Sequence, residues 1–154
     1  MIRWRADQLD QVIDTINATA PLDDRYLEAA LVSATGILTL TGIPSNAQTV
    51  TLGAKTYTFN TVLGGANSIL IGIDEEACVA NLVAAINGDA GEGTIYGTGT
   101  TANASATAAA APTPVQLTAT AITPGTAGNS IASTETLSAG AWSGATLAGG
   151  AEIP

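Results

Sequence analysis

The segment at 49–59 alternates threonine with larger apolar residues on both sides of a central Gly53-Ala54 pair. Alternation with a period of two places the apolar side chains on one face of a strand. A two-residue connection that begins with glycine suits a type II′ turn, because glycine adopts positive φ at little cost. The segment therefore predicts a β-hairpin with one buried face and one face toward solvent.

Several other stretches have the composition or the alternation of strands. The alanine-rich stretch 102–111 suits a helix or a strand, and its alternation of alanine with threonine and serine favours the strand. The run 94–96 suits a short strand or the edge of a loop. The remaining predicted strands are 37–41, 69–71, 115–121 and a final pair, 131–136 and 142–147, that completes the sheet.

Residues 74–87 show the clearest helical pattern in the chain. Three acidic residues, which are favourable at the positive end of a helix dipole, open the segment at Asp74. Apolar residues then recur at helical spacing, and Asn87-Gly88 tolerates the left-handed conformation that ends many helices. The expected apolar face consists of Val79, Leu82, Val83 and Ile86.

The first third of the chain differs from the rest, because it holds three of the four cations and an apolar stripe at helical spacing. A stripe that the segment cannot bury alone needs a surface to cover it. Tryptophan and arginine are frequent at binding hot spots, so Trp4 is either an interface anchor or a contact of this arm with its own body. The predicted interface residues are Arg3, Trp4, Arg5, Leu9, Val12, Ile13, Ile16, Tyr26 and Leu27.

These patterns predict an α+β fold, mainly an antiparallel β-sheet or sandwich with one packed helix at about 74–87 and an N-terminal helical arm. The expected divisions are an amphipathic arm at 1–34, a β-rich module at 35–150 and a tail at 151–154. Gly149-Gly150 is expected to begin this flexible tail. The large apolar side chains are sparse relative to alanine, which predicts a thin core.

Charge and residue types narrow the functional classes. The net charge is −9 with only four basic residues, which disfavours binding to nucleic acid or to anionic membranes. The chain has no histidine and one cysteine, so we expect no catalytic residues, no cofactor and no metal site. No secretory signal and no membrane helix are expected. Lys55 follows the hairpin turn and is expected to be exposed, and Trp142 is expected to pack in the body.

Four separated segments resemble a small module that recurs in structural proteins of tailed bacteriophages. They are T-V-T-L-G-A-K-T-Y-T-F from Thr49, N-L-V-A-A-I-N from Asn81, P-G-T-A-G-N from Pro124, and Glu135 together with W-S-G-A-T-L-A-G-G from Trp142. In larger phage proteins the module resembles a domain of tail, fibre or baseplate chains. The resemblance covers roughly 35–150 and brings no catalytic residues with it.

The resemblance implies a non-enzymatic structural protein of a virion, assembled in the host cytoplasm. A head decoration or cement protein fits the small size, with the major capsid protein or other virion proteins as partners. Such proteins commonly form dimers or trimers, so a homo-oligomer is expected. A tail, neck or fibre-anchoring component is the alternative. A virion-exposed carbohydrate-binding module ranks third, since Tyr57, Tyr96 and Trp142 are scattered along the sequence.

Overall fold

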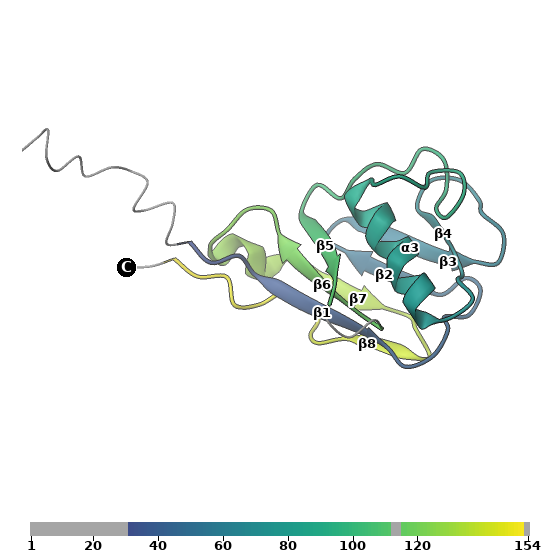
Figure 1. Ribbon diagram of the computed structural model, residues 1–154. Coiled ribbons are helices and arrows are strands. Elements are labelled where there is room, and N and C mark those ends of the chain that lie inside the picture. The colour runs from purple at the N-terminus through teal and green to yellow at the C-terminus, as the bar shows by residue number, and fades with distance from the viewer. Residues whose placement is uncertain (1–30, 112–114, 153–154) are drawn as a thin grey trace, which may run out of the picture. The chain divides into compact units, whose positions relative to one another are not determined.

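The computed structural model describes residues 31–111 and 115–152 (Figure 1). All of these except Leu31 belong to one body, Val32–Glu152. The elements of this body are β1 (Thr35–Leu40), β2 (Thr49–Leu52), β3 (Lys55–Asn60), β4 (Ser68–Leu70), α3 (Glu75–Asn87), β5 (Ala106–Ala110), β6 (Gln116–Ala121), the 3-10 helix η1 (Thr126–Ser130), β7 (Ser133–Glu135) and β8 (Gly140–Trp142). The α+β class and the β-rich architecture predicted from the sequence are confirmed, whereas the predicted N-terminal arm lies outside the described residues.

The predicted hairpin is present as β2 and β3, with Leu52 paired to Lys55 across the two-residue turn. Gly53 has φ of 62°, and Ala54 has no positive φ, which fits a type II′ turn rather than type I′. The apolar residues of both strands are fully buried, and the threonines between them are half-buried or exposed. The alternation in the sequence therefore predicted the buried face of the hairpin correctly.

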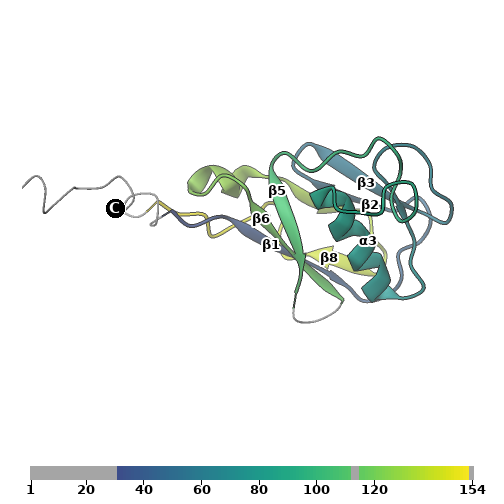
Figure 2. The same cartoon turned by 45° about the horizontal axis from the view of Figure 1, so that its top comes forward.

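The eight strands form two four-stranded sheets (Figures 1 and 2). The first has the order β5-β6-β1-β8 and is antiparallel throughout. The second has the order β4-β3-β2-β7 and is antiparallel except for β3 and β4, which run parallel. This parallel pair requires a connection longer than a hairpin, which the loop between Asn60 and Ser68 supplies.

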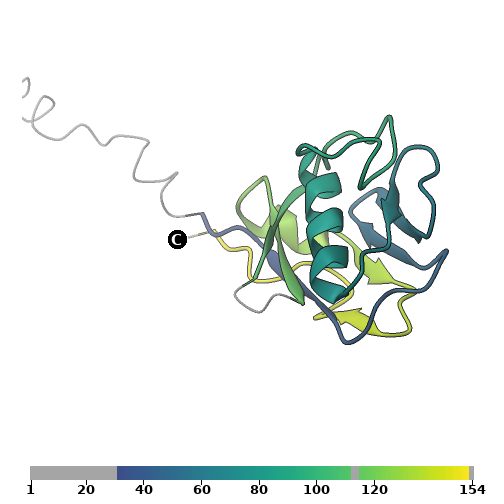
Figure 3. The same cartoon turned by 45° about the vertical axis from the view of Figure 1, so that its right-hand side comes forward.

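Helix α3 connects the two sheets along one side, because it packs against β4 of the second sheet and β5 of the first (Figure 3). On the opposite side, the edge strands β7 and β8 lie next to each other. The elements thus follow one another around a closed ring, with the helix at one junction and the β7–β8 seam at the other. A single hydrophobic core fills this ring and takes residues from both sheets and from the helix.

The predicted helix is confirmed as α3, and both of its ends follow the sequence signals. The Asp74 side chain accepts a hydrogen bond from Ala77 N at 2.8 Å, which caps the first turn. Gly88 adopts the left-handed conformation with φ of 71°. The buried residues of the helix are Cys78, Val79, Leu82, Ala85 and Ile86, whereas Val83 is half-buried.

Side-chain amides close the outer edge of β5. Asn87, the last residue of α3, donates from Nδ2 to Ala108 O at 2.8 Å and accepts from Ala108 N at 2.9 Å. Its amide therefore replaces the neighbouring strand that Ala108 lacks. Asn103 accepts hydrogen bonds from Ser105 N and Ala106 N at the start of the same strand.

The two ends of the body lie together. Val32 and Ala151 exchange backbone hydrogen bonds of 3.0 and 3.1 Å, and Thr35 pairs with Ala148 in the same manner. Gly150 is held by Asn129, which accepts from Gly150 N at 2.8 Å and donates to Gly150 O at 2.9 Å. The body consequently extends a few residues beyond the predicted 35–150 at both ends, and Gly150 is held in place instead of opening a flexible tail.

Three further details differ from the sequence predictions. The last two strands do not complete one sheet: β7 pairs with β2, and β8 pairs with β1. Within 94–96, only Tyr96 takes part in strand-like bridges. Lys55 is half-buried instead of exposed, because its ammonium donates to Thr101 Oγ1 and to Ala102 O, each at 3.0 Å. Its partial burial lowers the pKa of the ammonium.

Candidate binding cleft at the β7–β8 seam

The seam between β7 and β8 is closed at one end by backbone pairing. Ser133 N donates to Ala145 O at 2.9 Å, and Leu147 N donates to Ile131 O at 3.0 Å. The Ser133 hydroxyl adds a hydrogen bond to Gly144 O at 2.9 Å. These contacts join Ile131 and the first residue of β7 to the segment after β8, so the two sheets are linked at this end.

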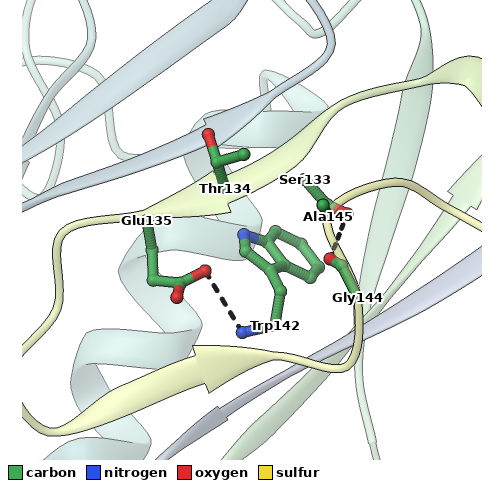
Figure 4. A pocket seen from close by; sticks show the side chains of 6 residues that line it. All are labelled: Ser133, Thr134, Glu135, Trp142, Gly144 and Ala145. Atoms are coloured by element: carbon green, nitrogen blue, oxygen red, sulfur yellow. Dashed lines mark hydrogen bonds between the residues drawn. The ribbon is translucent and has the colours of Figure 1, made fainter.

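Toward the other end, this backbone pairing stops and a cleft of about 380 Å³ opens between β7 and β8 (Figure 4). Glu135 spans this part of the seam, since its Oε2 accepts a hydrogen bond from Trp142 N at 3.3 Å. Glu135 is the only charged residue among those that line the cleft. The lining residues are Ser133, Thr134, Glu135, Trp142, Gly144 and Ala145.

The strand registers direct unpaired backbone groups toward the seam. Ser143 N bonds Ile37 O and Thr41 N bonds Ala139 O, so the alternation along β8 turns the backbone of Gly140 and Trp142 away from β1. By the same alternation, β7 turns the backbone of Glu135 away from β2. Within the described residues, the backbone N–H groups of Gly140 and Glu135 have no hydrogen-bond partner.

Trp142 forms one wall of the cleft and is confirmed as a core residue, with 8% of its surface exposed. Its indole Nε1 is buried and has no hydrogen-bond acceptor among the described residues. A buried donor without a partner costs about 1–3 kcal/mol, so this indole favours an acceptor brought by a bound group. The cleft has room for far more than one water, which occupies about 30 Å³ in the liquid.

The arrangement combines a carboxylate, a free indole N–H and strand backbone groups without partners. It offers carboxylate acceptors to a donor-rich group and several N–H donors to acceptors, which is the chemistry of binding. In the described part of the chain, no three side chains of the metal-ligating types gather in one place. A second hollow of about 250 Å³ near η1 is lined by residues without charge, such as Ser105, Thr123 and Ile131.

The structure describes only some of the residues that the sequence analysis considered as site residues. All nine predicted interface residues fall within 1–30, outside the described residues, so their role stays a prediction. The three aromatic residues considered for carbohydrate binding, Tyr57, Tyr96 and Trp142, are all buried. Sequence reasoning did not identify the cleft; the one available signal was that Glu135 and the segment after Trp142 belong to the same feature of the resemblance.

The chain matches no protein-family model and no curated protein. No helix among residues 31–111 and 115–152 has the length and apolar character needed to cross a bilayer.

Proposed function

We propose that this chain is a non-enzymatic structural protein of a tailed-phage virion, and that it serves as a decoration or cement protein on the outside of the head. The four segments that carry the resemblance lie around the ring of the body: the β2–β3 hairpin, helix α3, the turn at η1 and the β7–β8 seam. They are separated in the sequence, yet each contributes to the same closed body. This distribution supports a resemblance of the whole module rather than of one local motif.

The observation that carries the proposal is that the chain enters and leaves the body at neighbouring positions. Because Val32 pairs with Ala151, the segments before and after the body start from the same place. The buried residues of the hydrophobic core described for this body come from positions 34–147. A body of this design can be held on a surface by a separate attachment segment without being deformed.

Stabilisation of a shell by such a protein needs no chemical step. A protein that binds only the assembled lattice stabilises it by mass action, in proportion to the logarithm of its free concentration over its Kd. The major capsid protein is the proposed partner, and the chain is proposed to act as a homo-oligomer, a dimer or a trimer. The predicted interface at Arg3 to Leu27 supplies the contact.

A tail, neck or fibre-anchoring component is the second candidate, and the same geometry favours it. Adjacent ends allow a body to be inserted into a longer chain without strain. A carbohydrate-binding role has less support, since such sites use exposed aromatic rings. The exposed fractions of Tyr57, Tyr96 and Trp142 are 0%, 3% and 8%.

The location of the chain on purified particles tests the proposal directly. Electron cryomicroscopy of particles is expected to show its density at many symmetric positions over the head. Density confined to the tail or neck would select the second candidate, and absence from particles would reject both.

The attachment segment can be tested by truncation. A protein that starts at Val32 is expected to fold, because the body forms its own compact unit with a core built from positions 34–147, and to lose attachment to particles stripped of the protein. Circular dichroism checks the fold and co-sedimentation checks attachment. Val12→Asp places a charge on the predicted stripe and should weaken attachment, whereas Gln11→Asp places the same charge next to it and should not. Full attachment of the truncated body would move the contact to the body itself.

A further inference from the structure

The Glu135 carboxylate has acceptor positions to spare. Its Oε2 accepts one hydrogen bond from Trp142 N, and its Oε1 accepts none from residues 31–111 and 115–152. An ionised carboxylate offers about four acceptor positions, so most of those of Glu135 have no donor among the described residues. Glu135 is half-buried at the cleft, where its charge is screened less than on an open surface.

A ligand that suits this cleft must bring several donors and at least one acceptor. The donors satisfy Glu135, and the acceptor satisfies the buried indole N–H of Trp142. An arginine within a peptide has both, because its guanidinium presents five N–H donors and the flanking peptide carbonyls accept. Guanidinium–carboxylate pairs are also the stronger class of hydrogen bond.

The chain itself contains a segment of this kind. Its first five residues hold Arg3, Trp4 and Arg5 and no acid, whereas all 13 acidic residues follow later. The body offers no competing cation at the seam: Lys55, the only basic residue among those described, bonds to the loop at Thr101 and Ala102. The basic start of one copy is therefore complementary in charge to the acidic body of another.

We propose that the β7–β8 cleft binds the first five residues of a second copy of this chain, with an arginine side chain paired to Glu135 and a peptide carbonyl accepting from the Trp142 indole. The inference deepens the self-association part of the proposed function and does not depend on a virion. It makes the seam an acceptor site and the start of the chain its ligand, so each copy carries both halves of a head-to-tail contact.

A peptide experiment tests the site without altering the fold. An amidated peptide of residues 1–5 is titrated into isotope-labelled full-length protein, and the indole N–H resonance of Trp142 is followed by NMR, with Trp4→Phe used for assignment. A saturable shift that weakens with added salt is expected. The matched peptide with citrulline in place of both arginines keeps the shape and loses the charge, so it should not bind. Equal binding of the citrulline peptide, or no shift with either, overturns the proposal.

Self-association of the full chain tests the source of the ligand. Sedimentation equilibrium is expected to show a salt-sensitive oligomer, with Kd raised about tenfold or more by Glu135→Gln. Glu76→Gln makes the same change of charge on an exposed helix residue away from the seam and should leave Kd unchanged. A monomer at all salt concentrations overturns the second copy as the occupant, even where the peptide binds. If the chain is monomeric, the protein that starts at Val32 still tests attachment to particles. The two proposals can therefore fail independently of each other.

Discussion

The buried amide of Asn103 provides a sharp test of how this body is held together. It is 6% exposed and makes four hydrogen bonds through its side chain. Nδ2 donates to Leu52 O at 3.0 Å and to the Tyr57 hydroxyl at 3.3 Å, while Oδ1 accepts from Ser105 N at 2.9 Å and Ala106 N at 3.2 Å. The amide thus links the loop before β5 to the β2–β3 hairpin.

Asn103→Ala removes all four bonds and leaves the Tyr57 hydroxyl and the N–H groups of Ser105 and Ala106 without this partner. Tyr57 is completely buried, and Ala106 is 1% exposed, so neither the Tyr57 hydroxyl nor the Ala106 N–H can turn to bulk water. A buried group left unsatisfied costs about 1–3 kcal/mol, and two or three such groups give a loss of about 3–5 kcal/mol. Since a domain of this size has a total stability of about 5–15 kcal/mol, the variant should lie close to the limit of folding.

Urea denaturation followed by circular dichroism measures the loss. The midpoint should fall strongly while the slope stays the same, because the surface exposed on unfolding is unchanged. Asn46→Ala is the matched control: Asn46 is exposed and its Oδ1 accepts from Thr61 N and Thr61 Oγ1. It should lose less than about 1 kcal/mol. If the two variants lose the same amount, water replaces the amide at position 103 and the reasoning about buried backbone groups is refuted.

Two further substitutions test the packing and the charge of the core. Gly97→Ala should lose about 3 kcal/mol in the same urea assay, because its Cβ would collide with the backbone oxygen of Gly65, whereas a Cβ at Gly65 meets nothing, so that Gly65→Ala should be nearly neutral. Burial raises the pKa of the Tyr57 phenol above its ordinary value of about 10, more than the Asn103 hydrogen bond lowers it. The neutral phenol is thus favoured by folding, and this stability is lost as pH rises above about 10. Tyr57→Phe should lose less stability than the unchanged protein between neutral and alkaline pH; parallel urea midpoints would contradict this.

Local patterns predicted the parts of the fold that local physics determines. Helix α3 was placed correctly, because its cap at Asp74, its apolar spacing and its end at Gly88 all lie within one short window. The β2–β3 hairpin was equally accessible, since two residues determine its turn and alternation determines its buried face. Strand β6 was predicted for the same reason: its inner residues alternate with threonine.

The partners of the last strands could not be predicted in this way. β7 and β8 follow each other closely in the chain, which favours pairing with each other, yet each joins the edge of a different sheet. Their partners β2 and β1 lie more than eighty residues earlier, so no local signal specifies them. The cleft arises from this divergence, because Glu135 and Trp142 are neighbours only when the two sheets are in place. No local sequence pattern therefore predicts the cleft.

The closure of the ring explains why the seam is the place at which this body can bind. Large apolar residues are few, and exposed sheet edges invite pairing with other chains. The edge of β5 is closed by the amide of Asn87, and the edge of β4 by Ile95 and Gly97, whose backbones bond to Leu70 and Ser68. The two remaining edges, β7 and β8, lie side by side but belong to different sheets, and the backbone bonds at their seam join Ile131 and Ser133 to residues that follow β8. A peptide that can pair with backbone groups, with a carboxylate and with an indole N–H finds all three at this junction of the described body, and its binding would extend the backbone pairing along the seam.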